Sequence, residues 1–150
     1  MNSNNKIYST FNEVLVKLFN DIMHIEEKAI ITEEFKDISN NDMHIIEAIG
    51  IDEPKNMSQV AKALSVTVGT LTIAINNLVK KGYVDRVRSE KDRRVVYISL
   101  SSKGRKAFVH HAKFHEAMIK ATVNGLSTEE VNILVKSLEN LAGFFRDWQH

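Results

Sequence analysis

The sequence predicts a mainly α-helical fold with a small β wing, a winged helix-turn-helix with extra N- and C-terminal helices. Three observations in residues 57–104 support this prediction. Two helical segments are separated by a tight break at residues 65–67, Gly82 ends the second segment, and two apolar-rich strands then flank a loop rich in arginine. A helix, turn, helix and hairpin in this order are the parts of a winged helix-turn-helix.

Residue types at the segment ends define the two central helices. Ser58 is a candidate cap for the first helix, because its hydroxyl can accept from an otherwise unpaired backbone N–H. Thr67 is the corresponding candidate for the second helix, which we expect to begin at about Val68. Apolar side chains at helical spacing give this helix one buried face: Leu71, Ala74, Ile75, Leu78 and Val79. Lysines followed by Gly82, which can adopt a left-handed conformation, favour a helix end there.

The opposite face of the second helix is small, uncharged and able to form hydrogen bonds. It consists of Gly69, Thr70, Thr72, Ile73, Asn76 and Asn77. A surface helix that is only solvated more often carries Glu and Lys, whereas this face suits a helix that enters the major groove of DNA and contacts base edges. The alternative is a polar helix surface that is merely poor in charge.

The predicted hairpin carries positive charge. Residues 80–94 contain seven Lys or Arg and three acidic residues, and in the second strand Val96, Ile98 and Leu100 alternate with more polar positions. Such a cluster can neutralise phosphates, and a narrow minor groove attracts arginine. A solvated loop is the alternative. The candidate DNA-binding residues of the hairpin are Arg86, Arg88, Ser89, Lys91, Asp92, Arg93 and Arg94.

Composition limits the class of protein. With 43% apolar and 26% charged residues in 150 positions, the chain can build a core, and we expect a single domain over 1–150. The absence of cysteine excludes disulfides and thiolate metal ligands. No apolar run reaches the length of a membrane span and the N-terminus does not resemble a signal peptide, so we expect a cytoplasmic protein. Motifs for phosphate loops and catalytic nucleophiles are absent, and we predict no enzyme activity.

The terminal segments predict long amphipathic helices that leave apolar faces uncovered by a winged helix of residues 39–100. These segments are 7–31 and 105–149, the latter interrupted at Gly125, after which Ser127 and Glu130 form a predicted capping box for the last helix. Large exposed apolar faces imply a partner, and a homodimer would also place two recognition helices about 34 Å apart on a palindromic site. The alternative is a monomer whose terminal helices fold back on each other.

The hairpin motif Asp92-x-Arg94 followed by Leu100-Ser101-x-x-Gly104 resembles the wing of the MarR family of transcriptional regulators. The resemblance extends over the whole chain and is strongest to the FabT-type repressors of bacterial fatty-acid synthesis. It implies that Arg94 enters the minor groove, held by Asp92. Ser101 departs from the commoner Thr, although both residues can cap a helix.

The same resemblance implies an acyl group on acyl carrier protein as co-repressor, with the acyl chain in an apolar tunnel. We expect the tunnel to be lined by residues among Leu18, Ile22, Phe35, Met43, Ile46, Phe108, Met118 and Ile119, although an apolar stripe at helical spacing is commonly plain core.

Histidines offer a second possibility for an effector site. His111 and His115 are four residues apart on one helical face, a spacing typical of zinc ligands, and His44 and Glu26 are candidates to approach them. We predict that these are hydrogen-bonded core histidines and that the protein has no metal cofactor, with zinc as the alternative.

The sequence as a whole predicts a homodimeric repressor that binds double-stranded DNA and controls fatty-acid synthesis genes. The alternatives are a zinc-responsive regulator of the same family and, from another class, a winged helix that binds protein.

Overall fold

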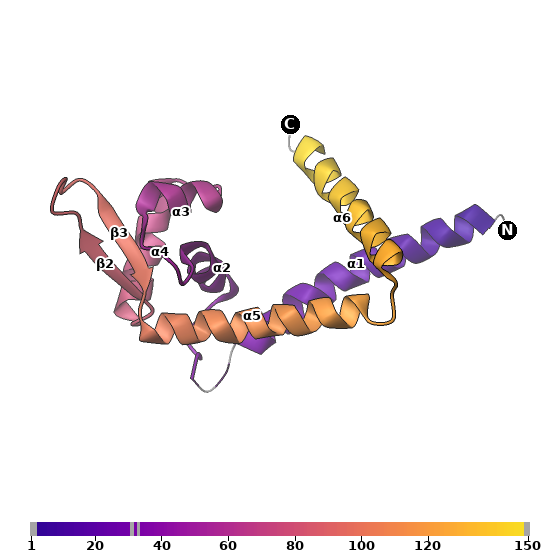
Figure 1. Cartoon of the computed structure of the whole chain (residues 1–150), viewed down its shortest axis with the longest axis horizontal. Helices are drawn as coiled ribbons and strands as arrows, with labels where there is room; N and C mark the ends of the chain where they lie inside the picture. Colours follow the sequence, from indigo (N-terminus) through magenta and orange to yellow (C-terminus); the bar gives the residue numbers. More distant parts are fainter. Residues whose placement is uncertain (1–2, 31, 33, 149–150) are drawn as a thin grey trace. The chain divides into compact units, whose positions relative to one another are not determined.

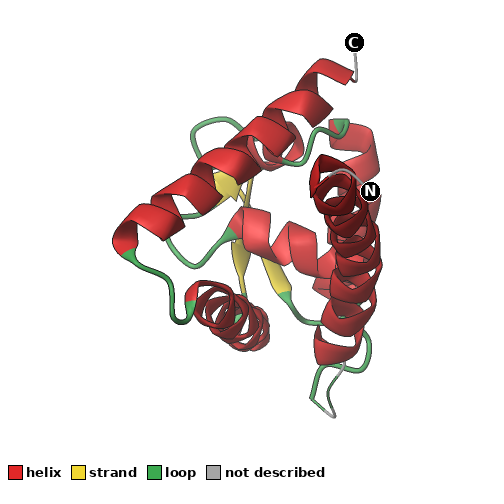
Figure 2. Ribbon diagram, turned by 90° about the vertical axis from the view of Figure 1, so that its right-hand side faces the viewer, coloured by secondary structure: helices red, strands yellow, loops and turns green. Residues whose placement is uncertain are grey.

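The computed structural model describes residues 3–30, 32 and 34–148. Six helices and three strands occur within these ranges (Figure 1). In chain order they are α1 (Ser3–Ile30), α2 (Asn40–Ile49), β1 (Lys55–Asn56), α3 (Met57–Ala63), α4 (Val68–Lys80), β2 (Val84–Arg88), β3 (Val96–Leu100), α5 (Ser102–Val123) and α6 (Thr128–Trp148). Figure 2 shows the strands, in yellow, confined to one small sheet in a chain that is otherwise helical. The predicted mainly helical fold with a β wing is confirmed.

The chain divides into two compact units, residues 1–113 and 114–150, with α5 continuous across the boundary. The hydrophobic core lies in the first unit and joins side chains from α2, α3, α4 and the sheet. Its fully enclosed members include Ile46, Val60, Ile75, Leu78 and Ile98. Burial of these apolar side chains fixes α4 against the rest of the winged helix, because each contributes about 1.5–3 kcal/mol when removed from water.

The helices α3 and α4 form the predicted helix-turn-helix and are bent by 105° with respect to each other. Asn56 caps α3, accepting from Gln59 N at 2.8 Å in a reciprocal capping box, so the prediction that Ser58 caps this helix is wrong. Ser58 is exposed in the first turn instead. In the turn, Ser65 adopts a left-handed conformation with φ of 54°. Thr67 caps α4 as predicted, accepting from Thr70 N at 3.1 Å.

The sheet has three antiparallel strands in the order β1-β3-β2, one strand more than the sequence predicted. β1 is only two residues long, and it pairs Lys55 with Ile98 and Asn56 with Tyr97. The hairpin of β2 and β3 pairs Val84 with Leu100 at its base. This register places alternate β3 residues in the core, as the predicted alternation requires.

The base of the hairpin is joined to α5 at Tyr83. The buried Tyr83 carbonyl accepts a hydrogen bond from Ser101 N at 3.0 Å, and Ser101 Oγ donates to Gly82 O at 2.5 Å while accepting from Gly104 N at 3.1 Å. A Cβ on Gly104 would overlap the Tyr83 carbonyl. The close approach of two backbones therefore requires Gly104 of the Leu100-Ser101-x-x-Gly104 motif, and the hydrogen bonds of Ser101 close the junction.

A polar network connects the same junction to α2. Tyr83 Oη donates to Asp37 Oδ1 at 2.6 Å, and Lys81 Nζ binds Asp37 O at 2.6 Å and Asp42 Oδ2 at 3.0 Å. The hydrogen bond from Tyr83 lowers the pKa of Asp37, and the charges of Lys103 and Lys81 lower it further. Burial and the bond to Asp37 raise the pKa of Tyr83. The C-terminal end of α4 is thereby fastened to the N-terminal end of α2.

The outer helices α1, α5 and α6 lie where the sequence predicts helices. α1 begins earlier than the predicted residue 7, and the predicted helical positions Ile31 and Gln149 lie outside the described residues. α6 starts in the predicted capping box, in which Ser127 Oγ accepts from Glu130 N at 3.2 Å. Among the described residues no single helix is long and apolar enough to cross a membrane; only α3 and α4 counted together, across their bend, have the length and composition of a span.

We expect Gly104→Ala to lower the free energy of unfolding by about 1–3 kcal/mol, because the added methyl group must displace the Tyr83 carbonyl or the start of α5. Urea unfolding measures the change. Gly69→Ala is the matched control, since a Cβ there has its nearest neighbour, Thr67 Oγ1, at 3.9 Å and alanine favours a helix. Equal stability of the two variants would contradict the proposed role of the close approach.

We expect stability to depend on pH through Asp37. A carboxyl whose pKa is lowered by folding stabilises the protein above its ordinary pKa near 4, and this contribution is lost as pH falls through the folded value. Tyr83→Phe should lower stability at pH 7 by about 1 kcal/mol and flatten the loss below pH 4. Urea unfolding across this pH range, with Tyr8→Phe on the exposed surface of α1 as control, tests the expectation. Parallel pH profiles for Tyr83→Phe and the unmodified chain would contradict it.

Candidate nucleic-acid interface

The predicted recognition face of α4 lies on the surface. Gly69, Thr70 and Asn77 are exposed and Thr72 and Asn76 are half-exposed, while Leu71, Ile75 and Leu78 on the other side of the helix are buried. Thr72 Oγ donates to Val68 O at 2.7 Å, which turns its hydroxyl proton towards the helix. The face therefore presents small groups, an apolar side chain at Ile73 (68% exposed) and amides, with no charge of its own.

Asn76 also contacts the hairpin. Arg86 Nη1, on β2, donates to Asn76 Oδ1 at 2.6 Å. Both residues were candidates for DNA contact in the sequence, but their spacing of ten residues gave no sign that they pair. The contact joins the recognition face to the first strand of the wing.

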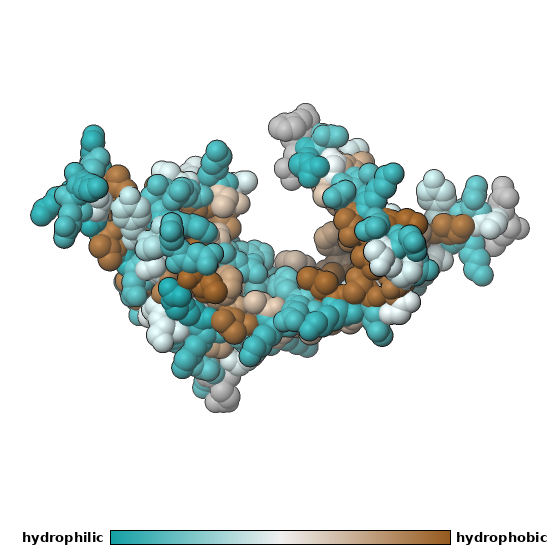
Figure 3. Space-filling model, viewed as in Figure 1, coloured by the Kyte–Doolittle hydropathy of each residue, from teal (hydrophilic) through white to brown (hydrophobic). Residues whose placement is uncertain are grey.

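The loop of the wing is a closed turn of hydrogen bonds. Ser89 N donates to Val95 O at 2.9 Å, Val95 N donates to Asp92 O at 2.9 Å, and Ser89 Oγ accepts from Asp92 N at 3.3 Å. Figure 3 shows the tip of the wing as hydrophilic surface. The exposed residues there include the predicted Lys91, Arg93 and Arg94.

Asp92 holds Arg94 in a two-pronged ion pair. Arg94 Nε donates to Asp92 Oδ1 at 3.0 Å and Arg94 Nη2 to Asp92 Oδ2 at 3.1 Å, while the side chain of Arg94 is 91% exposed. These hydrogen bonds lower the pKa of Asp92. The guanidinium is therefore oriented by a carboxylate that stays ionised, and its remaining N–H groups face solvent.

Within the first unit, the candidate ligand residues do not line one cavity. Phe35, Met43 and Ile46 belong to the closed core and Phe108 packs against it, while on α1 Leu18 is exposed and Ile22 is half-buried. Met118 and Ile119 belong to the second unit. A cavity of about 510 Å³ beside the first half of α5 includes only Phe35 from this set. Its other lining residues are Glu34, Ser102, Arg105, Lys106, Val109, His110 and Lys113. Apolar periodicity alone did not distinguish core from cavity, since both need the same residue types.

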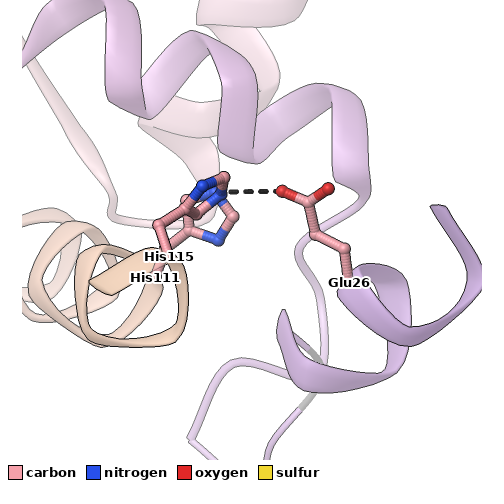
Figure 4. Close-up of side chains that lie close together, drawn as sticks. All are labelled: Glu26, His111 and His115. Carbon is pink, nitrogen blue, oxygen red and sulfur yellow. Dashed lines mark ion pairs between the residues drawn. The ribbon is translucent and has the colours of Figure 1, made fainter. Parts of the chain in front are cut away.

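A buried imidazole connects α1, α2 and α5. His111 Nε2 lies 2.9 Å from Glu47 Oε1 and 3.3 Å from Glu26 Oε1, with 2% of its side chain exposed, and Figure 4 shows the pair formed with Glu26. His115 follows one turn later on α5. His44, expected to approach His111, is exposed on α2 and lines a cavity with α4, so Glu47 is the α2 residue that occupies this place. Carboxylate oxygens and an imidazole nitrogen are types of donor that Zn²⁺ accepts.

Comparisons with known proteins agree with this geometry. Residues 23–111 match the transcriptional regulator SarA/Rot family. The structure of FabT from Streptococcus pneumoniae in complex with DNA is similar, with a TM-score of 0.84 and 45% identity over 94% of this chain and 99% of that chain. A mutant of MarR from E. coli, solved with operator DNA, shares the fold, with a TM-score of 0.60 at 24% identity over 87% of this chain and 96% of that chain.

Among curated relatives, the HTH-type transcriptional regulator PchR of Bacillus subtilis is 24% identical, in an alignment that covers 86% of this chain and 86% of that protein. These relatives are transcriptional regulators, and the matched family spans more than half of the sequence. The chain therefore belongs to the MarR/SarA-type family of winged-helix transcriptional regulators, which bind DNA.

Proposed function

We propose that the protein is a homodimeric repressor that binds a palindromic operator and controls genes of fatty-acid synthesis, with acylated acyl carrier protein as co-repressor. The observation that carries this proposal is the 45% identity, over nearly the whole chain, to FabT of Streptococcus pneumoniae, a protein solved in complex with DNA. The resemblance to FabT-type repressors implies both the regulated genes and the co-repressor. The geometry of α4 and the wing supports the DNA-binding part of the proposal.

The proposed contacts with DNA divide between two surfaces. Thr70, Thr72, Asn76 and Asn77 on α4 face base edges in the major groove, and Thr67 and Ser58 contact phosphate near the two helix starts. Arg94, oriented by Asp92, enters the minor groove. The other hairpin residues bind the backbone: Arg86, Arg88, Ser89, Lys91 and Arg93.

The proposed dimer is supported by the terminal helices, each considered by itself. None of the described residues of α6 is buried, although Ile133, Leu138 and Phe145 are apolar. Ile7, Phe11 and other large apolar side chains of α1 are also exposed, and brown surface near the N-terminal end of this helix is visible in Figure 3. Apolar surfaces of this extent call for a covering partner, and a second copy supplies one together with the second recognition helix.

The cavity beside α5 supports an anionic, apolar effector. Phe35 and Val109 give it apolar walls, and its cations Arg105, Lys106 and Lys113 outnumber its one carboxylate, Glu34, which lies 3.6 Å from Lys106 Nζ. An acidic carrier protein is attracted by such a cluster of cations. The tunnel residues named above that belong to the closed core would have to move to admit an acyl chain.

A zinc-responsive regulator is the second candidate, favoured by the carboxylate of Glu26 beside the imidazole of His111, two of the residues in the zinc site that the sequence suggests. Its effector would be Zn²⁺ rather than a lipid. Elemental analysis of protein purified without added zinc separates the candidates, since stoichiometric zinc that resists dialysis supports the second one.

We expect the affinity for a palindromic operator to rise in the presence of acylated acyl carrier protein and to be unchanged by the carrier without its acyl group. Titration of a fluorescent operator with the protein measures both, and saturation at two chains per palindrome is expected for the homodimer. An affinity that responds to Zn²⁺ and not to the acylated carrier would replace the lipid effector by the metal. No response to either would refute both effectors.

We expect Arg94→Ala to weaken operator binding and to reduce the slope of log affinity against log salt concentration by roughly one, because one phosphate-proximal cation is lost. Asp92→Ala should weaken binding without removing that cation, because the guanidinium loses its two-pronged partner. A salt titration of the three proteins on one operator is the measurement. Binding by Arg94→Ala that matches the unmodified chain at every salt concentration would exclude the proposed minor-groove contact.

A further inference from the structure

The contact between Arg86 and Asn76 fixes the orientation of an amide on the recognition face. Arg86 Nη1 lies 2.6 Å from Asn76 Oδ1. A guanidinium has donors and no acceptor, so the atom of the amide that faces it must be the oxygen. The NH₂ group of Asn76 is therefore directed away from Arg86.

The position of Arg86 is itself determined by the sheet. Arg86 pairs with the buried Ile98 in the β2–β3 register, and Val84, two residues earlier on β2, is buried as well. Side chains two residues apart on a strand lie on one face, so Arg86 projects on the side of the sheet that faces the core and α4. The amide of Asn76 is thus held by the base of the wing and not only by its own helix.

This orientation limits what Asn76 offers to a base. Asparagine recognises adenine in the major groove by accepting from N6–H₂ and donating to N7, which requires its oxygen and its nitrogen together. Here one lone pair of the oxygen already accepts from a cation, which turns the oxygen towards the wing and places the NH₂ group on the other side of the amide. Guanine, with acceptors at O6 and N7, matches an amide whose oxygen is turned towards Arg86 and whose NH₂ group lies on the other side.

We propose that Arg86 is a positioning residue that sets base preference: by holding the carbonyl of Asn76, it makes this side chain select guanine over adenine at one base pair of each half-site. The inference rests on the proposed binding of α4 in the major groove. It assigns Arg86 a role in specificity, in addition to any contact with phosphate.

The test uses the full-length protein and an operator selected from random duplexes, with each position of the half-site replaced in turn by all four base pairs. Arg86→Ala frees the carbonyl of Asn76, so the preference for guanine over adenine at one position should fall by about ten-fold or reverse. Arg86→Lys keeps a donor for the carbonyl and should retain the preference. Asn76→Asp keeps the contact with Arg86 but has no donor, so preference should move to cytosine, whose N4–H₂ group donates.

The controls separate positioning from loss of charge or of fold. Arg88→Ala removes a cation from the same strand and should weaken binding by the same factor on all four base pairs. In the free protein, the side-chain amide NMR signals of Asn76 should shift in Arg86→Ala and less in Arg86→Lys. Equal losses on all four base pairs for Arg86→Ala, or an adenine preference in the unmodified chain, would overturn the inference. Absence of any operator binding by the unmodified chain would instead refute the proposed function.

Discussion

The arrangement of the DNA-binding elements depends on the close approach between the Tyr83 carbonyl and the backbone of Gly104. Tyr83 follows the C-terminal end of α4 and precedes β2, while Gly104 lies in the first turn of α5. The carbonyl of Tyr83 binds Ser101 N and its hydroxyl binds Asp37. One buried residue thereby fixes the end of the recognition helix, both ends of the hairpin and the start of α5. A side chain at residue 104 would separate these elements.

Two arginines of the wing have different partners, and in the proposed complex with DNA one would serve affinity and the other specificity. Arg94 is oriented by a carboxylate and keeps its charge directed outwards, where phosphates of any sequence attract it. Arg86 instead donates a hydrogen bond from Nη1 to the carbonyl oxygen of Asn76. Since the net charge of the chain is only +1, attraction to DNA must come from the local excess of cations around the hairpin. The uncharged face of α4 is then left for base recognition.

Features determined by neighbours in sequence were predictable, and features determined by packing were not. The cap at Thr67, the left-handed Gly82 and the capping box of α6 depend on residues within four positions, and each is present as predicted. The cap at Asn56 is equally local, because its partner is Gln59, and the pattern Asn56-x-x-Gln59 is the signal that could have found it in place of Ser58. Glu47 was missed in favour of His44 for a different reason. Both lie on α2, and only the packing of α2 against α5 determines which one meets His111.

The terminal helices show why the winged helix alone is an incomplete description of this chain. The core of the first unit is formed by side chains of α2, α3, α4 and the sheet. In α6, none of the described residues is buried. Ordering a helix costs about 1–2 kcal/mol of backbone entropy per residue. In an amphipathic helix this cost is offset mainly by burial of the apolar face. Leu138 and Phe145 are both about half exposed, so their burial in the isolated chain does not offset this entropy cost. The proposed second copy would cover such a face, and it would also bring the second α4 that a palindromic operator requires.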